Sequence, residues 1–186
     1  GMVYLSFPTE VGTIYSLSEL QAIREVCNHY ALSLFVDGAR LGYGLCSPLC
    51  DVTLPQLATL ADIFYIGGTK VGALFGEAVV IVNEGLKRDF RYSIKRHGGM
   101  LAKGRLLGIQ FETLFTNNLY FEIARHAVTQ ALRVKDVLQA KGFHLMIDSP
   151  TNQQFVILPN DVLDQLSQQF VLSPWEPLEG NRTAVR

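Results

Sequence analysis

A carboxylate and an amine follow two apolar runs of the sequence. One run ends at Asp-Gly-Ala-Arg, residues 37–40, and the next ends at Gly-Gly-Thr-Lys, residues 67–70. Strands at both runs would place Asp37 and Lys70 at the ends of two consecutive strands. One bound pyridoxal phosphate could use both groups there: the lysine would form a Schiff base, and the aspartate would hold the pyridine nitrogen protonated.

Each of these residues also has a simpler interpretation. Asp-Gly is a common turn dipeptide, and a lysine that follows a strand is usually solvated. Arg40 lies just beyond Asp37, within reach of the same pocket. A guanidinium group binds an α-carboxylate through two parallel hydrogen bonds, so Arg40 is a candidate for substrate binding, with a surface arginine as the alternative.

Alternating strands and helices must position these residues. Apolar patterning predicts strands over residues 3–7, 32–36 and 62–66, with helices over 17–30 and 54–60 between them. This order predicts a mostly parallel sheet with right-handed crossovers. Such sheets bind ligands beyond the carboxyl ends of their strands, where Asp37 and Lys70 would lie.

Further elements follow in a less regular pattern. A strand over 78–82 comes after a link too short for a parallel return, so we expect an antiparallel neighbour. We expect a Gly/Pro/Cys-rich loop over 41–52, a helix over 84–96 and a long helical stretch over 101–140 with a break at Asn117-Asn118. Short strands over 144–147, 154–158 and near Ala184, with a helix over 161–169, complete the prediction.

These elements predict an α/β fold: a partial cofactor-binding large domain over residues 2–140 and a partial small C-terminal α/β domain over 141–186. The 186 residues are 48% hydrophobic and 18% charged, which indicates a globular chain with a buried core.

Charge and cysteine content argue against several other classes of protein. The net charge of −1 gives no general attraction to nucleic acid or membranes, and no apolar run approaches the ~20 residues of a membrane helix. The three cysteines are interpreted as reduced thiols of a cytoplasmic protein. No histidine or cysteine pair has convincing metal-ligand spacing, so we expect no metal site.

Positive charge is concentrated in one stretch. Seven of the 16 basic residues fall there: Lys87, Arg88, Arg91, Lys95, Arg96, Lys103 and Arg105. A phosphate site with His97-Gly98-Gly99 as a backbone nest is one interpretation, and a solvated helix face is another. Nucleic-acid binding is the weakest interpretation, because no aromatic stacking pattern accompanies these charges.

Four segments together resemble one enzyme family: 34–41, 67–70, 97–100 and 182–186. The chain is similar to the threonine aldolase branch of the β-eliminating lyases, which are pyridoxal-phosphate enzymes of the aspartate aminotransferase fold type. The resemblance implies that Asp37 pairs with the pyridine nitrogen and that Lys70 carries the cofactor. It also implies that Arg40 and Arg186 bind the substrate carboxylate.

The resemblance further implies an assembly. In the family, a basic residue after the glycine-rich segment reaches the cofactor phosphate of a neighbouring subunit. Leu101 follows Met100 here, so Lys103 or Arg105 must take that role. We therefore expect a homo-oligomer, a dimer or tetramer, that acts on a small amino acid.

The chain also differs from the family pattern. Family members are longer and carry an upstream phosphate-holding loop and a residue that stacks on the cofactor ring, so we expect a fragment that lacks the N-terminal part. The implied reaction is cleavage of a β-hydroxy-α-amino acid to glycine and an aldehyde. The segment near Thr9 lacks the histidine common in threonine-specific members, which leaves β-elimination open. A non-catalytic remnant that self-associates or binds a partner is a further alternative.

Overall fold

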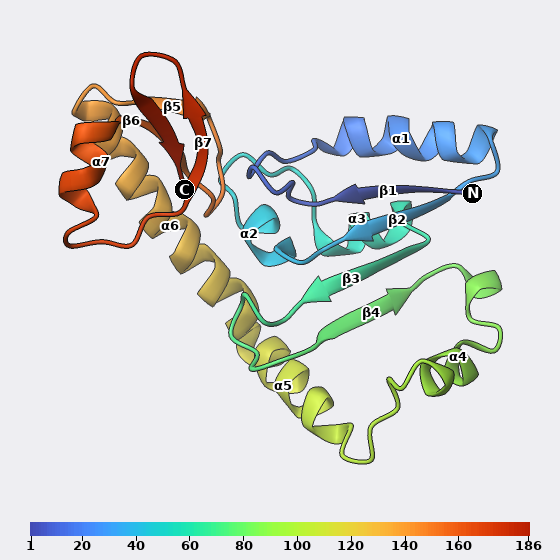
Figure 1. Ribbon diagram of the computed structural model, residues 1–186. Helices are drawn as coiled ribbons and strands as arrows, with labels where there is room; N and C mark the ends of the chain where they lie inside the picture. The colour runs from blue at the N-terminus through green and yellow to red at the C-terminus, as the bar shows by residue number, and fades with distance from the viewer.

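The computed structural model describes residues 1–186 and contains two β-sheets, with a long helix between them in the chain (Figure 1). The first sheet has four strands in chain order: β1 (Met2–Ser6), β2 (Ser33–Asp37), β3 (Ile63–Gly67) and β4 (Glu77–Ile81). The first three strands are parallel and β4 runs antiparallel to β3. The predicted mostly parallel sheet with an antiparallel fourth strand is therefore confirmed.

Two helices connect the parallel strands, and each begins at a capping box. Ser16 caps α1 (Leu17–His29) with Glu19, and Thr53 caps α3 (Leu54–Leu60) with Gln56. In a capping box each of the two residues binds a free backbone N–H of the first helical turn, which fixes where the helix begins. Both helix starts follow the predicted positions.

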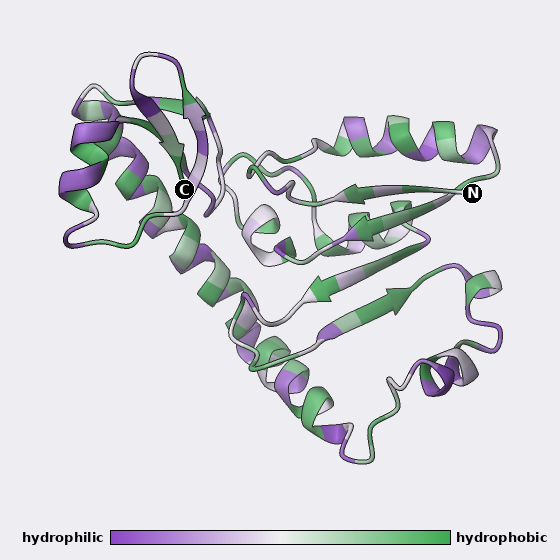
Figure 2. Cartoon of the chain, viewed as in Figure 1, coloured by the Kyte–Doolittle hydropathy of each residue, from purple (hydrophilic) through white to green (hydrophobic).

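Only one face of the first sheet belongs to the main core. Leu34 and Phe64 point to this face and pack with Leu20 of α1 and Leu57 of α3. The opposite face stays open, and Tyr4 of β1 is 56% exposed there. Figure 2 shows the four strands as largely apolar, while helix surfaces alternate between apolar and polar residues.

The prediction of a loop over 41–52 was wrong at its start, where the chain forms α2 (Leu41–Leu45). Two glycines give this segment a poor intrinsic helix propensity. Tertiary contacts outweigh that preference, because residues 41–44 are all buried. The predicted helix over 84–96 is also divided, into a 3₁₀ turn at Glu84–Leu86 and α4 (Phe90–Arg96), with Asp89 between them in the left-handed conformation at φ 55°.

The long helical stretch breaks where predicted. It consists of α5 (Arg105–Phe115), a 3₁₀ turn at Thr116–Asn118 and α6 (Leu119–Ala140), and it begins at residue 105 rather than 101. Asn117 and Asn118 have φ values of 51° and 60°. Asparagine tolerates this left-handed region better than most residues, so the pair separates the two helices.

The second sheet is antiparallel, in the order β5-β6-β8-β7. Its strands are β5 (His144–Ile147), β6 (Phe155–Pro159), β7 (Pro174–Leu178) and β8 (Arg182–Val185), with α7 (Asn160–Leu166) after β6. The sequence did not predict β7, because it contains two prolines; these are tolerated at the edge of a sheet. No helix of the chain is both long and apolar enough to cross a membrane.

The proposed boundary between residues 2–140 and 141–186 stays a prediction. Each sheet has its own core, however, and the small core of the second sheet contains Val156, Leu158 and Val185. Helix α6 contributes to both cores, through Val128 to the first and Leu138 to the second. The helix therefore fixes how the two sheets are placed relative to each other.

Candidate active site

Asp37 is the last residue of β2, and both of its carboxylate oxygens accept hydrogen bonds. The Tyr4 hydroxyl donates to Oδ2, and the Ala39 backbone N–H donates to Oδ1 at 2.9 Å. Tyr4 comes from β1, where it pairs with Phe35 in the parallel register and stacks on its ring. The strand pairing thus brings a tyrosine hydroxyl to the carboxylate.

This environment keeps Asp37 ionised. Partial burial acts to raise the pKa of its carboxyl, but the hydrogen bonds from Tyr4, Tyr65 and Ala39 and the charge of Lys70 outweigh burial and leave the pKa below its ordinary value. Burial and the neighbouring Asp37 carboxylate raise the pKa of the Tyr65 hydroxyl. The site therefore contains a fixed negative charge with neutral phenols beside it.

Lys70 lies beyond the end of β3 and is exposed. The Tyr43 hydroxyl donates to its backbone carbonyl, which fixes the backbone at the lysine. None of the four ion pairs of the chain includes Lys70. The backbone at Lys70 is therefore fixed, and its amine takes part in no ion pair of the chain.

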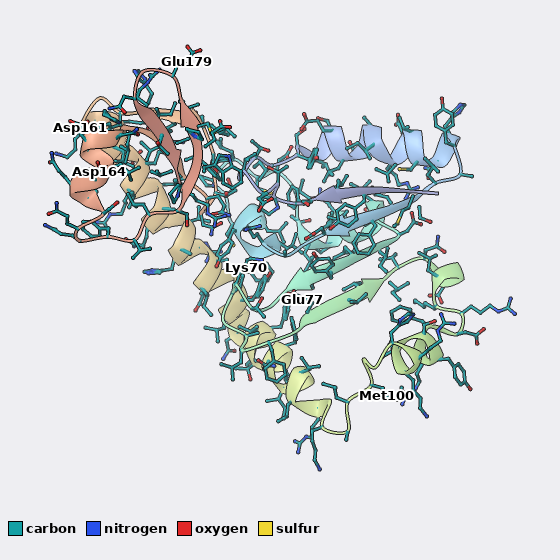
Figure 3. The ribbon with its side chains drawn as sticks, in the orientation of Figure 1. Lys70, Glu77, Met100, Asp161, Asp164 and Glu179 are labelled. Atoms are coloured by element: carbon teal, nitrogen blue, oxygen red, sulfur yellow. The ribbon has the colours of Figure 1, made fainter.

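Glu77 adds a second acidic group near Lys70, at the start of β4 (Figure 3). Its Oε2 accepts the Gly68 backbone N–H at 3.0 Å. Burial raises the pKa of the Glu77 carboxyl, although the Gly68 hydrogen bond and the Lys70 charge act in the opposite direction. This carboxyl is therefore easier to protonate than Asp37.

The turns after β2 and β3 touch through two glycines. The Gly67 N–H donates to the Gly38 carbonyl at 2.8 Å. A Cβ on Gly38 would lie 1.9 Å from the Tyr65 carbonyl oxygen, and one on Gly67 would lie 2.3 Å from the Ala39 carbonyl oxygen. Backbone packs against backbone at both positions, so only glycine fits and the two turns stay together.

The structure brings three of the predicted cations to one cavity. The cavity has a volume of about 360 Å³ and is lined by Arg40, Tyr43, Lys70, Asn152, Gln153 and Arg186. Asp37, the last residue of β2, does not line the cavity but lies close enough to Lys70 for the lysine charge to lower its carboxyl pKa. The Arg186 guanidinium also lies 6.0 Å from the centre of the Trp175 ring, within cation–π range. Groups from both sheets thus converge on the space predicted for a cofactor and its substrate.

Lys103 and Arg105 do not line this cavity, and both are exposed. Met100 and Lys70 are well separated in Figure 3: Lys70 lies near the end of β3, and Met100 lies beyond β4, beside α4. The basic stretch makes only local ion pairs, Lys87 with Glu84 at 2.6 Å and Arg88 with Asp89 at 3.7 Å. A role for Lys103 or Arg105 in a neighbouring subunit stays a prediction.

Sequence reasoning missed the polar groups that hold these residues in place. Tyr4, Tyr43, Tyr120 and Gln153 all belong to this set. The tyrosines lie far from their partners in sequence and carry no local signal. Only Gln153 had one: it lies in a polar run, residues 151–154, immediately before a strand.

A family model described as "Beta-eliminating lyase" matches residues 1–160 of the chain. The chain belongs to the beta-eliminating lyase family. Members of this family use pyridoxal phosphate, and the chain shares their α/β fold. The predicted family and fold class are therefore confirmed.

Two curated relatives are similar over most of the chain. The low specificity L-threonine aldolase of Pseudomonas aeruginosa is 31% identical over 166 residues, which are 89% of this chain and 48% of the relative. The enzyme of the same name from Pseudomonas sp. is 30% identical over the same shares of both chains. The chain thus spans about half the length of the curated relatives it matches.

Two solved structures have the same fold as this chain. The threonine aldolase of Leishmania major is 45% identical and superposes with a TM-score of 0.97 over 99% of this chain and 54% of that chain. A PLP-dependent aminotransferase of Streptococcus suis, 16% identical with a TM-score of 0.68 over 99% of this chain and 51% of its own, shares the fold.

Proposed function

We propose that this chain carries the lysine, aspartate and arginines of a pyridoxal-phosphate-dependent threonine aldolase, which cleaves a β-hydroxy-α-amino acid to glycine and an aldehyde. The observation that carries the proposal is the convergence of Lys70, Arg40 and Arg186 on one cavity beside Asp37. The similarity to enzymes named threonine aldolase supports the choice of substrate class.

The groups present suit the cofactor. Asp37 offers an ionised carboxylate to a protonated pyridine nitrogen, and Lys70 offers an amine that no ion pair occupies. Lys70 would hold the cofactor covalently and Asp37 would keep its ring nitrogen protonated. When bound, pyridoxal phosphate supplies an electron sink for the carbanion left at Cα.

The two arginines provide substrate recognition. Arg40 enters the cavity from the turn after β2, and Arg186 enters from the end of β8. Guanidinium groups bind carboxylates through parallel, charge-assisted hydrogen bonds. Together they would hold the α-carboxylate of an amino acid, which fixes the orientation of its Cα–Cβ bond relative to Lys70.

The working form that we propose is a homo-oligomer in the cytoplasm. Lys103 and Arg105 are exposed and remote from the cavity of their own chain, which supports a role at a neighbouring copy. Three free cysteines support a reducing compartment. Mixing Lys70→Ala with a Lys103→Ala/Arg105→Ala variant tests the assembly: cofactor binding should recover in the mixed oligomer, whereas no recovery would contradict shared sites.

A second candidate is β-elimination, which the family model favours by its description. Threonine distinguishes the two reactions, because aldol cleavage yields glycine and acetaldehyde, whereas elimination yields 2-oxobutanoate and ammonia. We expect glycine and acetaldehyde in equal amounts from the cofactor-loaded protein and none from Lys70→Ala. Formation of 2-oxobutanoate would favour elimination, and no product from a fully loaded protein would favour the non-catalytic alternative.

A further inference from the structure

Gln153 is a buried polar residue whose side chain contacts the Arg40 guanidinium. Only 8% of the residue is exposed to solvent. With the amide oriented so that its oxygen faces Arg40, Oε1 accepts hydrogen bonds from Arg40 Nε at 3.0 Å and from Nη2 at 3.1 Å. The opposite orientation would place amide N–H groups against guanidinium N–H groups, so the hydrogen-bond network assigns the oxygen to this side.

The loop that contains Gln153 is hydrogen-bonded to the segment that follows β1 of the first sheet. The Ser149 and Thr151 hydroxyls donate to the Gly12 carbonyl at 3.0 Å and 3.2 Å. The Gln153 backbone N–H donates to Thr151 Oγ1 at 3.4 Å. A Cβ on Gly12 would lie 2.2 Å from Ser149 Oγ, so the contact requires glycine. The backbone at Gln153 is therefore held in place.

The geometry divides the donors of Arg40 between two partners. A guanidinium has one edge formed by Nε and Nη2 and another formed by Nη1 and Nη2, and either edge can bind a carboxylate with two parallel bonds. Gln153 occupies the Nε edge. The second edge is left for a ligand in the cavity that Arg40 shares with Arg186.

The charges around Arg40 also support one edge for Gln153 and the other for a ligand. Gln153 is neutral, and none of the four ion pairs of the chain includes Arg40. An acidic residue in the place of Gln153 could orient Arg40 equally well, but it would cancel the charge that attracts a carboxylate. A neutral acceptor provides the orientation and preserves the charge.

We propose that Gln153 is a positioning residue for the substrate carboxylate: it holds Arg40 by its Nε edge and directs the other edge into the cavity. The choice of an amino acid as ligand rests on the proposed function, whereas the contact with Arg40 does not.

Exchange of the Arg40 Nε–H with water, measured by NMR in the cofactor-free protein, tests the contact. The resonance is assigned by its loss in Arg40→Lys. Gln153→Met should accelerate this exchange about tenfold, as expected for the loss of one hydrogen bond. Gln168→Met, the same change at an exposed glutamine, should leave the rate unchanged. An unchanged rate in Gln153→Met would overturn the inference.

Glycine affinity of the cofactor-loaded protein tests the consequence. Gln153→Glu keeps the acceptor but adds a negative charge, so it should weaken glycine binding by about tenfold or more while Arg40 Nε–H exchange stays slow. Gln168→Glu should bind glycine as the unmodified chain does. Equal glycine affinity in Gln153→Glu would contradict the proposal. Failure to load the cofactor would contradict the proposed function but not the Gln153–Arg40 contact, because the exchange measurement tests that contact in the cofactor-free protein.

Discussion

The Tyr120 hydroxyl donates a hydrogen bond to the Gly67 carbonyl oxygen at 3.1 Å. The same hydroxyl accepts the Gly42 backbone N–H at 3.1 Å. Tyr120 belongs to α6 and is 1% exposed, while Gly42 lies in α2, after β2, and Gly67 is the last residue of β3. One buried phenol therefore joins the long helix to both segments that carry the candidate active-site residues.

Removing this hydroxyl should destabilise the chain. Tyr120→Phe leaves a buried carbonyl and a buried N–H without partners, which costs about 1–3 kcal/mol of unfolding free energy. Urea unfolding of the two proteins measures the difference. Tyr92→Phe removes a hydroxyl from a residue that is 76% exposed and serves as the matched control. Equal stabilities for Tyr120→Phe and the unmodified chain would show that the bridge contributes nothing.

The close contact between the two turns makes a second prediction. Gly38→Ala would place a Cβ 1.9 Å from the Tyr65 carbonyl oxygen, so the turn after β2 must shift and stability must fall. Gly108→Ala is the control, because a Cβ there meets nothing within 4 Å. Since Gly108 lies within α5, alanine should stabilise it by about 0.5–1 kcal/mol. Equal thermal unfolding temperatures for Gly38→Ala and Gly108→Ala would contradict this packing.

Tyr4 should control the ionisation of Asp37. Donation to the Asp37 carboxylate is the main reason that the pKa of the Tyr4 hydroxyl is raised, and it helps to hold the pKa of the Asp37 carboxyl below its ordinary value. Tyr4→Phe should therefore raise the pKa of Asp37, which an NMR titration of its side-chain carboxyl carbon measures. An unchanged Asp37 titration would exclude a significant contribution from Tyr4.

The same shift has a consequence for stability at low pH. A carboxyl with a lowered pKa in the folded chain stabilises it above the unfolded value of about 3.9, and this contribution disappears as the pH falls through the folded pKa. The loss of stability below about pH 4 should therefore be shallower in Tyr4→Phe than in the unmodified chain. Urea unfolding across the acidic range measures both slopes, and parallel slopes would count against the linkage.

Arg186 should contribute to substrate affinity rather than to folding. Arg186→Gln removes a charged donor from the cavity, and hydrogen bonds to charged groups contribute about 1.5–3 kcal/mol. Glycine binding to the cofactor-loaded protein should weaken by about 10- to 150-fold, while the Arg40 Nε–H exchange rate stays the same. Undiminished glycine affinity would remove Arg186 from the site.

Sequence alone predicted the parts of the structure that depend on local pattern. The apolar runs before Asp37 and Lys70 became parallel neighbours, and the two capping boxes fixed the starts of their crossover helices. Because both residues follow strands of one parallel sheet, topology was sufficient to place them at the same edge.

The remaining parts depend on contacts between residues distant in sequence. Helix α2 forms despite its glycines because it is buried against α6. Tyr120 reaches Gly67 across 53 positions, and Gln153 reaches Arg40 from the loop before the second sheet. No local spacing encodes such pairings, so the groups that hold the candidate site together emerge only from the three-dimensional structure.

The most direct test of the account is covalent capture of pyridoxal phosphate. The chain is incubated with the cofactor, the visible absorption band is recorded, and borohydride reduction is followed by peptide mapping. We expect a band that borohydride abolishes and a pyridoxyl group on the peptide that contains Lys70, and we expect neither in Lys70→Ala. Equal labelling of Lys70→Ala, or modification of other lysines instead, would contradict it.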